Sequence, residues 1–378
     1  TEYVSRRKVS KEDTNMNRHI QIESVPSLAG SNADLRIPVM PSEEHLALVQ
    51  IYNYIAEKLG KETTSVSFND SRIASVAEEL FACQGNSVLV SGSNDKDAQI
   101  LVILINTMLG NYGNTISNSV TYNLKKGDDS AVHDMLIRME KGEISGIIMD
   151  DSNPFYNLGN SFEKAFLKLD FSVSLSSRFN ETSRRCTYVA PDNHWLESWG
   201  DAMPTTNYLA SCQPCIAPLF DTRQRLESVL RWSGMSMKAY DFIRKVWFSD
   251  YFQQQSIYPT TGSFWDSIIH DGGLELQSVD VESHTVKNSH INSAKRLAET
   301  NTSKMEVRFY EKPQIGDGHY CDNPWMQELA DPITRISWDN YIVANPKWVE
   351  ENNLLDNFKA RTYQKVMLKT NDGVVTLP

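Results

Sequence analysis

The sequence contains no long uninterrupted apolar run. Its longest apolar stretch, residues 100–109, is broken by Asn106 and Thr107, whereas a helix that crosses a bilayer needs about 20 consecutive apolar residues. We therefore predict a buried helix at this stretch and no membrane span in this chain. The first residues also show no charged segment followed by an apolar one, so we predict no targeting signal within the sequence.

Positive charge is in short supply. The 378 residues include 37 Lys and Arg against 48 Asp and Glu, which gives a formal net charge of −11. An acidic chain repels the phosphate backbone of nucleic acids. The composition therefore predicts that nucleic acid is not a partner of this protein.

Cysteine is also scarce. A disulfide scaffold would need more cysteines and an even number of them, whereas this chain has five. Cys212 and Cys215 have the spacing of a metal or thiol-redox pair, but no second such pair completes a zinc or iron–sulfur ligand set. None of the eight histidines forms an HxxxH or HExxH motif. We predict no catalytic residue and no metal ligand here, with a working thiol centre at Cys212 and Cys215 as the less favoured alternative.

Short apolar segments alternate with helical segments between residues 87 and 190. Apolar and β-branched residues at 87–91, 146–150, 171–175 and 186–190 predict strands, and the segments between them predict helices. This alternation is typical of an α/β fold with a doubly wound parallel sheet that is buried on both faces. Right-handed crossovers place the carboxyl ends of such strands at one edge, where ligands bind.

The pattern of the sequence divides the chain into three parts. Residues 1–41 are polar and aperiodic, which predicts an extended arm or linker. Residues 42–303 contain the α/β domain, with an aromatic-rich helical extension at residues 221–273. Residues 304–378 begin a new β region, which we expect to form part of a separate domain.

Two signals indicate β structure in this last part. Residues 305–310 alternate between apolar and polar side chains, which predicts a strand. Residues 365–369 and 374–377 are apolar runs separated by Thr-Asn-Asp-Gly, which predicts a hairpin.

Three loops at predicted strand ends are candidates for ligand binding. The turn at Gly92, Ser93 and Asn94 precedes a helix, whose free backbone N–H groups attract anions, but it lacks the glycine pattern of a phosphate loop, and a plain turn is the favoured alternative. The second loop is 151–154. Asp150 and Asp151, followed by Asn153 and Pro154, could hold a metal or a nucleotide edge, and an ordinary Asx-rich turn is an equal alternative. The third loop is 178–182.

One series of segments is more specific than these patterns. It comprises the loop at 151–154, the strand segment at 166–173, Asn-Glu-Thr at 180–182, the strand segment at 188–191 and Leu-Glu-Ser-Trp-Gly at 196–200. This series resembles the third domain of molybdopterin oxidoreductases. In catalytic members of that family, the second and third loops lie near one pterin guanine dinucleotide.

The resemblance implies a set of candidate cofactor-binding residues on the three loops. They are Gly92, Ser93, Asn94, Asp151, Asn153, Pro154, Asn180, Glu181 and Thr182. Molybdopterin guanine dinucleotide is the cofactor that the family resemblance implies for them.

Other segments resemble one subfamily. Residues 21–34, 192–200, 216–224, 323–335 and 337–341 are similar to the hydrogenase-like subunit of alternative complex III, which fuses an iron–sulfur half to a molybdopterin-like half. The resemblance implies an internal fragment of that subunit, with the third domain and the start of a β-barrel fourth domain. It also implies a quinol-oxidising respiratory complex at the periplasmic face, with membrane and cytochrome c subunits and the other domains of the parent subunit as partners.

The sequence departs from the catalytic pattern in two respects. It has no CxxCxxxC cluster motif, so iron–sulfur clusters are expected only in the rest of the parent chain. Arg184, Arg185 and Cys186 stand where catalytic relatives have small residues and aspartate. We therefore expect a cofactor-free scaffold in an electron-transfer complex, and the alternative is a pterin guanine dinucleotide-binding domain of a catalytic molybdenum oxidoreductase.

Overall fold

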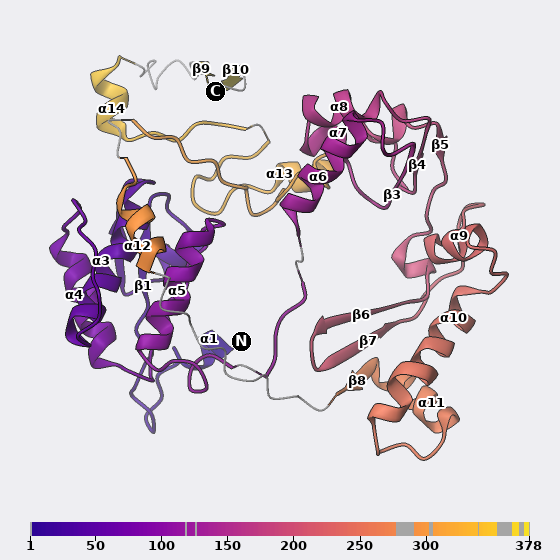
Figure 1. Cartoon of the computed structure of the whole chain (residues 1–378), viewed down its shortest axis with the longest axis horizontal. Coiled ribbons are helices and arrows are strands. Elements are labelled where there is room, and N and C mark those ends of the chain that lie inside the picture. Colours follow the sequence, from indigo (N-terminus) through magenta and orange to yellow (C-terminus); the bar gives the residue numbers. More distant parts are fainter. Residues whose placement is uncertain are drawn as a thin grey trace. The chain divides into compact units, whose positions relative to one another are not determined.

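The computed structural model describes residues 2–117, 119–124, 127–276, 291–301, 305–338, 340–353, 365–369 and 374–377. The chain forms two compact units. Unit 1 comprises Thr1–Ile116 and Thr285–Pro378, and unit 2 comprises Ser117–His284. Each unit is described here by itself (Figure 1).

Unit 1 is built around a helical core. Helices α3 (Glu43–Lys58), α4 (Ser71–Ala82), α5 (Lys96–Met108) and α12 (Ile291–Ala298) pack together (Figure 1). Their apolar residues recur at helical spacing, and the contact face is fully buried. Its most deeply buried members include Ile55, Ile73, Leu101 and Ile105. The helix predicted at residues 100–109 is therefore confirmed as the buried part of α5.

A small parallel sheet covers this core. Strand β1 (Ile20–Glu23) pairs with β2 (Leu35–Pro38), and the short helices α1 (Glu2–Ser5) and α2 (Leu28–Ser31) lie in the same segment. Ile37 of β2 is fully buried against the helices. The segment that we predicted to be an extended arm thus contains paired strands, because its few apolar residues are placed where they can reach the core.

The last part of unit 1 contains helices α13 (Pro324–Glu328) and α14 (Pro346–Glu351) and strands β9 (Val366–Lys369) and β10 (Val374–Leu377). The antiparallel pairing of β9 with β10 confirms the predicted hairpin. The strand predicted at residues 305–310 is wrong. Two of its alternate residues contact the start of α3 instead of a neighbouring strand. The Glu306 carboxylate accepts from the backbone N–H of Ser42, and Arg308 Nη1 donates to Glu44 Oε2 at 2.7 Å. The β-barrel remains a prediction.

Unit 2 contains a parallel sheet with the order β3 (Gly146–Met149), β4 (Phe171–Ser174) and β5 (Tyr188–Val189). Helices α6 (Asp129–Glu140) and α8 (Asn160–Phe166) cover one face, where Met139, Met149 and Phe162 are buried. Three of the predicted strands are therefore confirmed, and the chain is of the α/β class. The connection from β3 to the parallel strand β4 contains α8, as the sequence predicted, whereas the connection from β4 to β5 contains only a 3₁₀ turn at Ser183–Arg185.

The strand predicted at residues 87–91 is wrong. This segment belongs to unit 1 and pairs with no strand among the residues that the structure describes. The backbone N–H of Leu89 donates to Asn106 Oδ1 at 3.0 Å, and Asn106 Nδ2 donates to the Leu89 carbonyl at 2.7 Å. A side chain of α5 therefore satisfies the backbone groups that a neighbouring strand would otherwise satisfy.

The rest of unit 2 was not predicted as a sheet. Strands β6 (Gly200–Thr205), β7 (Tyr208–Cys212) and β8 (Gly273–Glu275) form an antiparallel sheet. Helices α9 (Arg225–Trp232), α10 (Ala239–Val246) and α11 (Thr261–Asp271) fall within the predicted helical extension. Trp247, Phe264 and Trp265 form the aromatic centre of this core.

The compact units do not follow the division predicted at residues 41 and 303. The chain returns to unit 1 after residue 284 because Ala294 and Leu297 of α12 bury themselves against α3 and α5. Residues 42–303 are therefore shared between the two units. Among the described residues, no helix combines the length and the apolar character needed to cross a membrane.

Candidate functional site

The clearest cluster of predicted site residues lies where β3 and β4 end. Asn153, in the loop after β3, donates from Nδ2 to Glu181 Oε2 at 2.7 Å, and its Oδ1 accepts from Thr182 Oγ1 at 2.7 Å. The nitrogen and the oxygen of this amide therefore each bind one side chain from the loop after β4. The structure brings together the second and third predicted loops, as expected for neighbouring parallel strands.

Further hydrogen bonds hold the loop that carries the partners of Asn153. Thr182 is fully buried, and its hydroxyl also accepts from the backbone N–H of Phe155 at 3.2 Å. Asn180 Oδ1 accepts from the backbone N–H groups of Thr182 and Ser183 at 3.1 and 2.8 Å, which fixes the turn. The hydrogen bond from Asn153 lowers the pKa of Glu181 below its usual value.

The backbone of the loop after β3 has an unusual conformation at Asp151 and a helix start at Pro154. Asp151 has a φ of 42°, in the left-handed region that non-glycine residues seldom adopt. Pro154 starts the short helix α7 (Pro154–Asn157), where its fixed φ suits the first turn. Asn153 precedes that helix but does not cap it, because its side chain is used by Glu181 and Thr182.

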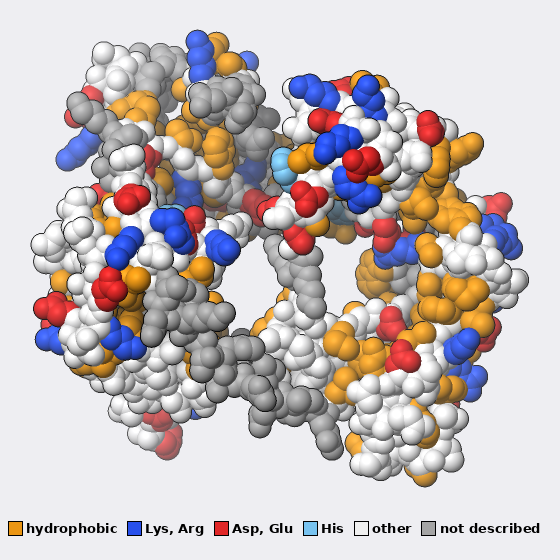
Figure 2. Space-filling view, in the orientation of Figure 1, with side chains coloured by type: hydrophobic (Ala, Val, Ile, Leu, Met, Phe, Trp, Pro, Cys, Tyr) orange, Lys and Arg blue, Asp and Glu red, His pale blue; other side chains and the backbone are white. Residues whose placement is uncertain are grey.

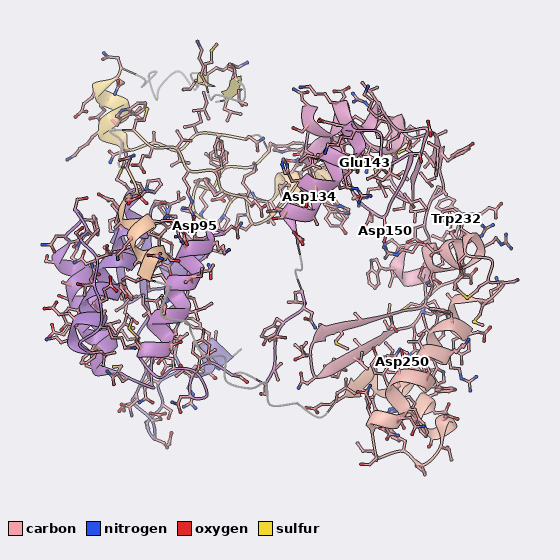
Figure 3. The ribbon with its side chains drawn as sticks, viewed as in Figure 1. Asp95, Asp134, Glu143, Asp150, Trp232 and Asp250 are labelled. Carbon is pink, nitrogen blue, oxygen red and sulfur yellow. The ribbon has the colours of Figure 1, made fainter. Side chains whose placement is uncertain are left out.

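An ion network that the sequence analysis missed lies beside this cluster. Arg225 Nη1, at the start of α9, donates to both carboxylate oxygens of Asp150 at 2.8 and 2.9 Å, and Arg225 Nε lies 3.2 Å from Asp192 Oδ2. Asp150 is labelled in Figure 3. Burial raises the pKa of Asp192, and the charge of Arg225 opposes that rise. Asp192 follows a predicted strand, but nothing in the sequence singled out Arg225.

The first predicted loop folds with unit 1. Ser93 Oγ lies 3.0 Å from Nε2 of His45 and accepts from the backbone N–H of Asp95 at 3.1 Å. Asp95, labelled in Figure 3 at the start of α5, caps that helix by accepting from the N–H of Ala98 at 2.9 Å. A carboxylate thus occupies the helix start where an anion would bind. A Cβ on Gly92 would meet nothing within 4 Å, so no close approach requires glycine there.

The nine predicted site residues are therefore divided between the two units. Gly92, Ser93 and Asn94 lie in unit 1, and the other six lie in unit 2. Within unit 2, Asn153, Asn180, Glu181 and Thr182 form one network. Cofactor binding at these positions remains a prediction.

One face of the parallel sheet in unit 2 carries exposed apolar side chains. Ile148, Phe171 and Tyr188 are on the same face by register and are 51%, 45% and 62% exposed. Apolar side chains gather over β5 and α9 in Figure 2. Val173, which lies between Ile148 and Tyr188 on this face, is only 9% exposed. The predicted burial of the sheet on both faces is therefore only partly met on this face, because α6 and α8 both lie on the opposite one.

Unit 1 contains a cavity with a volume of about 1270 Å³. It is lined by β1, by residues 86–93 and by residues of the segment 308–343. Gly92 and Ser93 are thus at the wall of a cavity in unit 1.

The polar side chains at the ends of β3 and β4 bind one another in this structure. The hydroxyl of Thr182 and both ends of the Asn153 amide are bound to protein groups, and the amide keeps a second N–H that these bonds do not use. Among the described residues, no group of three or more His, Cys, Asp or Glu side chains could hold a metal ion. Cys212 and Cys215 are free thiols, and Cys212 ends β7.

Comparisons with known proteins give little. No family model and no curated protein matches the sequence. Among solved structures, the fold is similar to acetylene hydratase from Pelobacter acetylenicus, with 11% sequence identity and a TM-score of 0.45. The similarity covers 84% of this chain and 56% of that enzyme's chain, so the present chain spans little more than half of it. At these values the likeness supports no statement about function.

Proposed function

We propose that this chain is a cofactor-free structural part of a molybdopterin-oxidoreductase-like subunit. The observation that carries the proposal is the closed network of Asn153, Glu181 and Thr182 at the ends of β3 and β4. These groups hold two loops together, which is a structural role.

The charged groups nearby support the same proposal. The guanidinium of Arg225 is bound by the carboxylates of Asp150 and Asp192. Arg185 Nη1 contacts Glu163 Oε1 at 2.9 Å, and its guanidinium lies 4.4 Å from the ring centre of Phe155. Guanidinium groups bind pyrophosphate well when they are free, and these two are already paired within unit 2.

The proposal is tested with the purified chain. We expect far less than one molybdenum or tungsten atom per protein by mass spectrometry, and no saturable heat of binding for guanosine diphosphate up to about 1 mM, a ligand range that detects free energies near −4 kcal/mol. Guanosine diphosphate represents the nucleotide half of the dinucleotide. Stoichiometric metal, or saturable nucleotide binding that Asn153→Ala abolishes, would contradict the scaffold proposal.

Such a result would instead favour the second candidate function, a pterin guanine dinucleotide-binding domain of a catalytic molybdenum oxidoreductase. The observation in its favour is the topology of unit 2. Ligands of parallel sheets bind at the carboxyl ends of the strands, and the loops there carry Asn153 and Glu181.

We also propose that the parent subunit belongs to a quinol-oxidising respiratory complex of the alternative complex III type, in the periplasm. The support is the sequence resemblance at residues 323–335 and 337–341. The proposed partners are membrane and cytochrome c subunits and the iron–sulfur domains of the parent chain. The subunit should co-purify from solubilised membranes with a haem c protein and with quinol oxidase activity. Isolation without either would contradict this assignment.

A further inference from the structure

Residues 219–225 of unit 2, which we call the strap, bury little apolar surface. The strap lies between β7 and α9 and ends at Arg225, the first residue of α9. Its two apolar residues, Leu219 and Phe220, are 72% and 77% exposed. Burial of apolar side chains is the dominant force that holds segments onto a protein. The strap therefore depends on contacts of another kind.

Polar contacts with the segment after β5 hold the strap. Three of its hydrogen bonds are accepted by side-chain oxygens of residues 192–197. They run from the Leu219 N–H to Glu197 Oε1 at 3.0 Å, from Thr222 Oγ1 to Asn193 Oδ1 at 2.6 Å, and from the Arg225 N–H to Asp192 Oδ1 at 2.7 Å. The amide of Gln224 donates to the carbonyl of Trp199. Side chains thus make or accept every one of these bonds.

The guanidinium of Arg225 spans the carboxyl end of the parallel sheet. Its Nη1 donates to both carboxylate oxygens of Asp150, which directly follows β3. Its Nε lies 3.2 Å from Oδ2 of Asp192, which follows β5. The order of the sheet is β3-β4-β5, so one side chain joins the residues beyond the two outer strands. This edge is the one at which parallel sheets bind ligands.

The contacts of Arg225 are weaker than those that hold the sheet. The side chains of Arg225 and Asp150 are 50% and 54% exposed, and exposed ion pairs add little stability and are screened by salt. The strands are held by backbone ladders, and the N–H of Asp192 donates to the carbonyl of Leu175 at 3.1 Å. Segments with few buried apolar contacts open locally while the rest of a protein stays folded.

We propose that residues 219–225 form a releasable strap, which Arg225 holds closed across the carboxyl end of the parallel sheet. Release separates Arg225 from Asp150 and Asp192 and uncovers the strand ends, while the sheet stays folded. The inference adds a movement to unit 2 and goes beyond the proposed scaffold role. Its failure would leave that role standing, because the role rests on the network of Asn153.

Hydrogen exchange of the full chain, followed by mass spectrometry, tests the strap. The N–H groups of Leu219 and Arg225 each bind a carboxylate that release would remove. We expect Arg225→Gln to speed the exchange of residues 219–226 by about fivefold, which is the upper range for loss of an exposed ion pair. The exchange of β4 should stay as slow as in the unchanged chain.

Two further variants and a change of salt sharpen the test. Arg231→Gln removes an exposed arginine from the last turn of α9 and should leave the exchange of the strap unchanged. Arg225→Lys keeps the charge but loses the planar fork, so its effect should be intermediate. Sodium chloride at about 1 M, which screens charges beyond about 3 Å, should speed the exchange of the strap in the unchanged chain and much less in Arg225→Gln.

Three outcomes would overturn the proposal. The first is an Arg225→Gln chain whose strap exchanges no faster than that of Arg231→Gln, which would mean that Arg225 does not hold it. The second is an equal rise in the exchange of β4, which would mean that Arg225 supports the whole fold rather than a separate strap. The third is the same response to salt with and without Arg225, which would mean that salt acts elsewhere.

Discussion

Asn153 makes the central contacts of the candidate site. Its amide connects the loop after β3 with the loop after β4, through Glu181 and the fully buried Thr182. Removing one partner of a buried hydrogen bond leaves the other group without water or protein to bind, which costs more than the bond itself gains. We therefore expect Asn153 to contribute more to the free energy of unfolding than an ordinary loop asparagine does.

We predict that Asn153→Ala lowers the free energy of unfolding by about 1–3 kcal/mol, because the buried hydroxyl of Thr182 loses its acceptor. Urea unfolding followed by circular dichroism measures this change. The matched control is Asn157→Ala on α7, an exposed asparagine, which should change stability by less than about 0.5 kcal/mol. Equal effects of the two substitutions would show that the network does not hold the loops.

At the scale of elements, an ion pair between Arg296 and Asp97 joins α12 to α5. Arg296 Nε donates to Asp97 Oδ2 at 2.6 Å, and Ser293 of α12 also supports Asp97. The hydrogen bond from Arg296 lowers the pKa of Asp97 from 3.8 to about 2. The folded state therefore holds the charged form more strongly than the unfolded chain does, so the contribution is present above about pH 4 and is lost as the pH falls towards 2.

We predict that Asp97→Asn lowers the urea midpoint at pH 6, and that its difference from the unchanged protein shrinks as the pH falls from about 4 to about 3. The reason is that both proteins then carry an uncharged side chain at this position in the unfolded state. Urea midpoints across this pH range provide the measurement. Glu140→Gln, at an exposed residue of α6, serves as the control. A difference that stays constant with pH would refute the role of the pair.

At the scale of the whole molecule, each unit has a core of its own. Unit 2 buries Met139, Met149 and Phe162 beneath its parallel sheet, and Trp247 and Phe264 beside its antiparallel sheet. A segment with its own hydrophobic core can fold independently. Unit 1, in contrast, is assembled from two distant parts of the chain, which α12 brings together.

We predict that residues 117–284, expressed alone, fold cooperatively. Circular dichroism should show mixed α/β structure and a sigmoidal thermal transition. Phe264→Asp in the same fragment should abolish that transition, because burying an unpaired carboxylate costs several kcal/mol. A broad, non-cooperative transition of the unchanged fragment would contradict its independence.

The sequence by itself determined the local features of this protein. The α/β class, three strands of the parallel sheet, the buried helix at residues 100–109 and the hairpin near the C-terminus follow from apolar periodicity and turn residues. The meeting of the loops at Asn153 and Glu181 also followed, because the ends of parallel strands are neighbours by topology. These features depend on short-range patterns that one sequence carries.

Tertiary structure decided the rest. Residues 87–91 have strand propensity, but Asn106 of α5 satisfies the backbone of Leu89, and the segment stays unpaired. Residues 305–310 alternate like a strand, but Ser42 and Glu44 of unit 1 bind them. Arg225 joins Asp150 across the fold without any local signal. Such partners are distant in sequence, and propensity alone does not say which backbone or charged groups will meet.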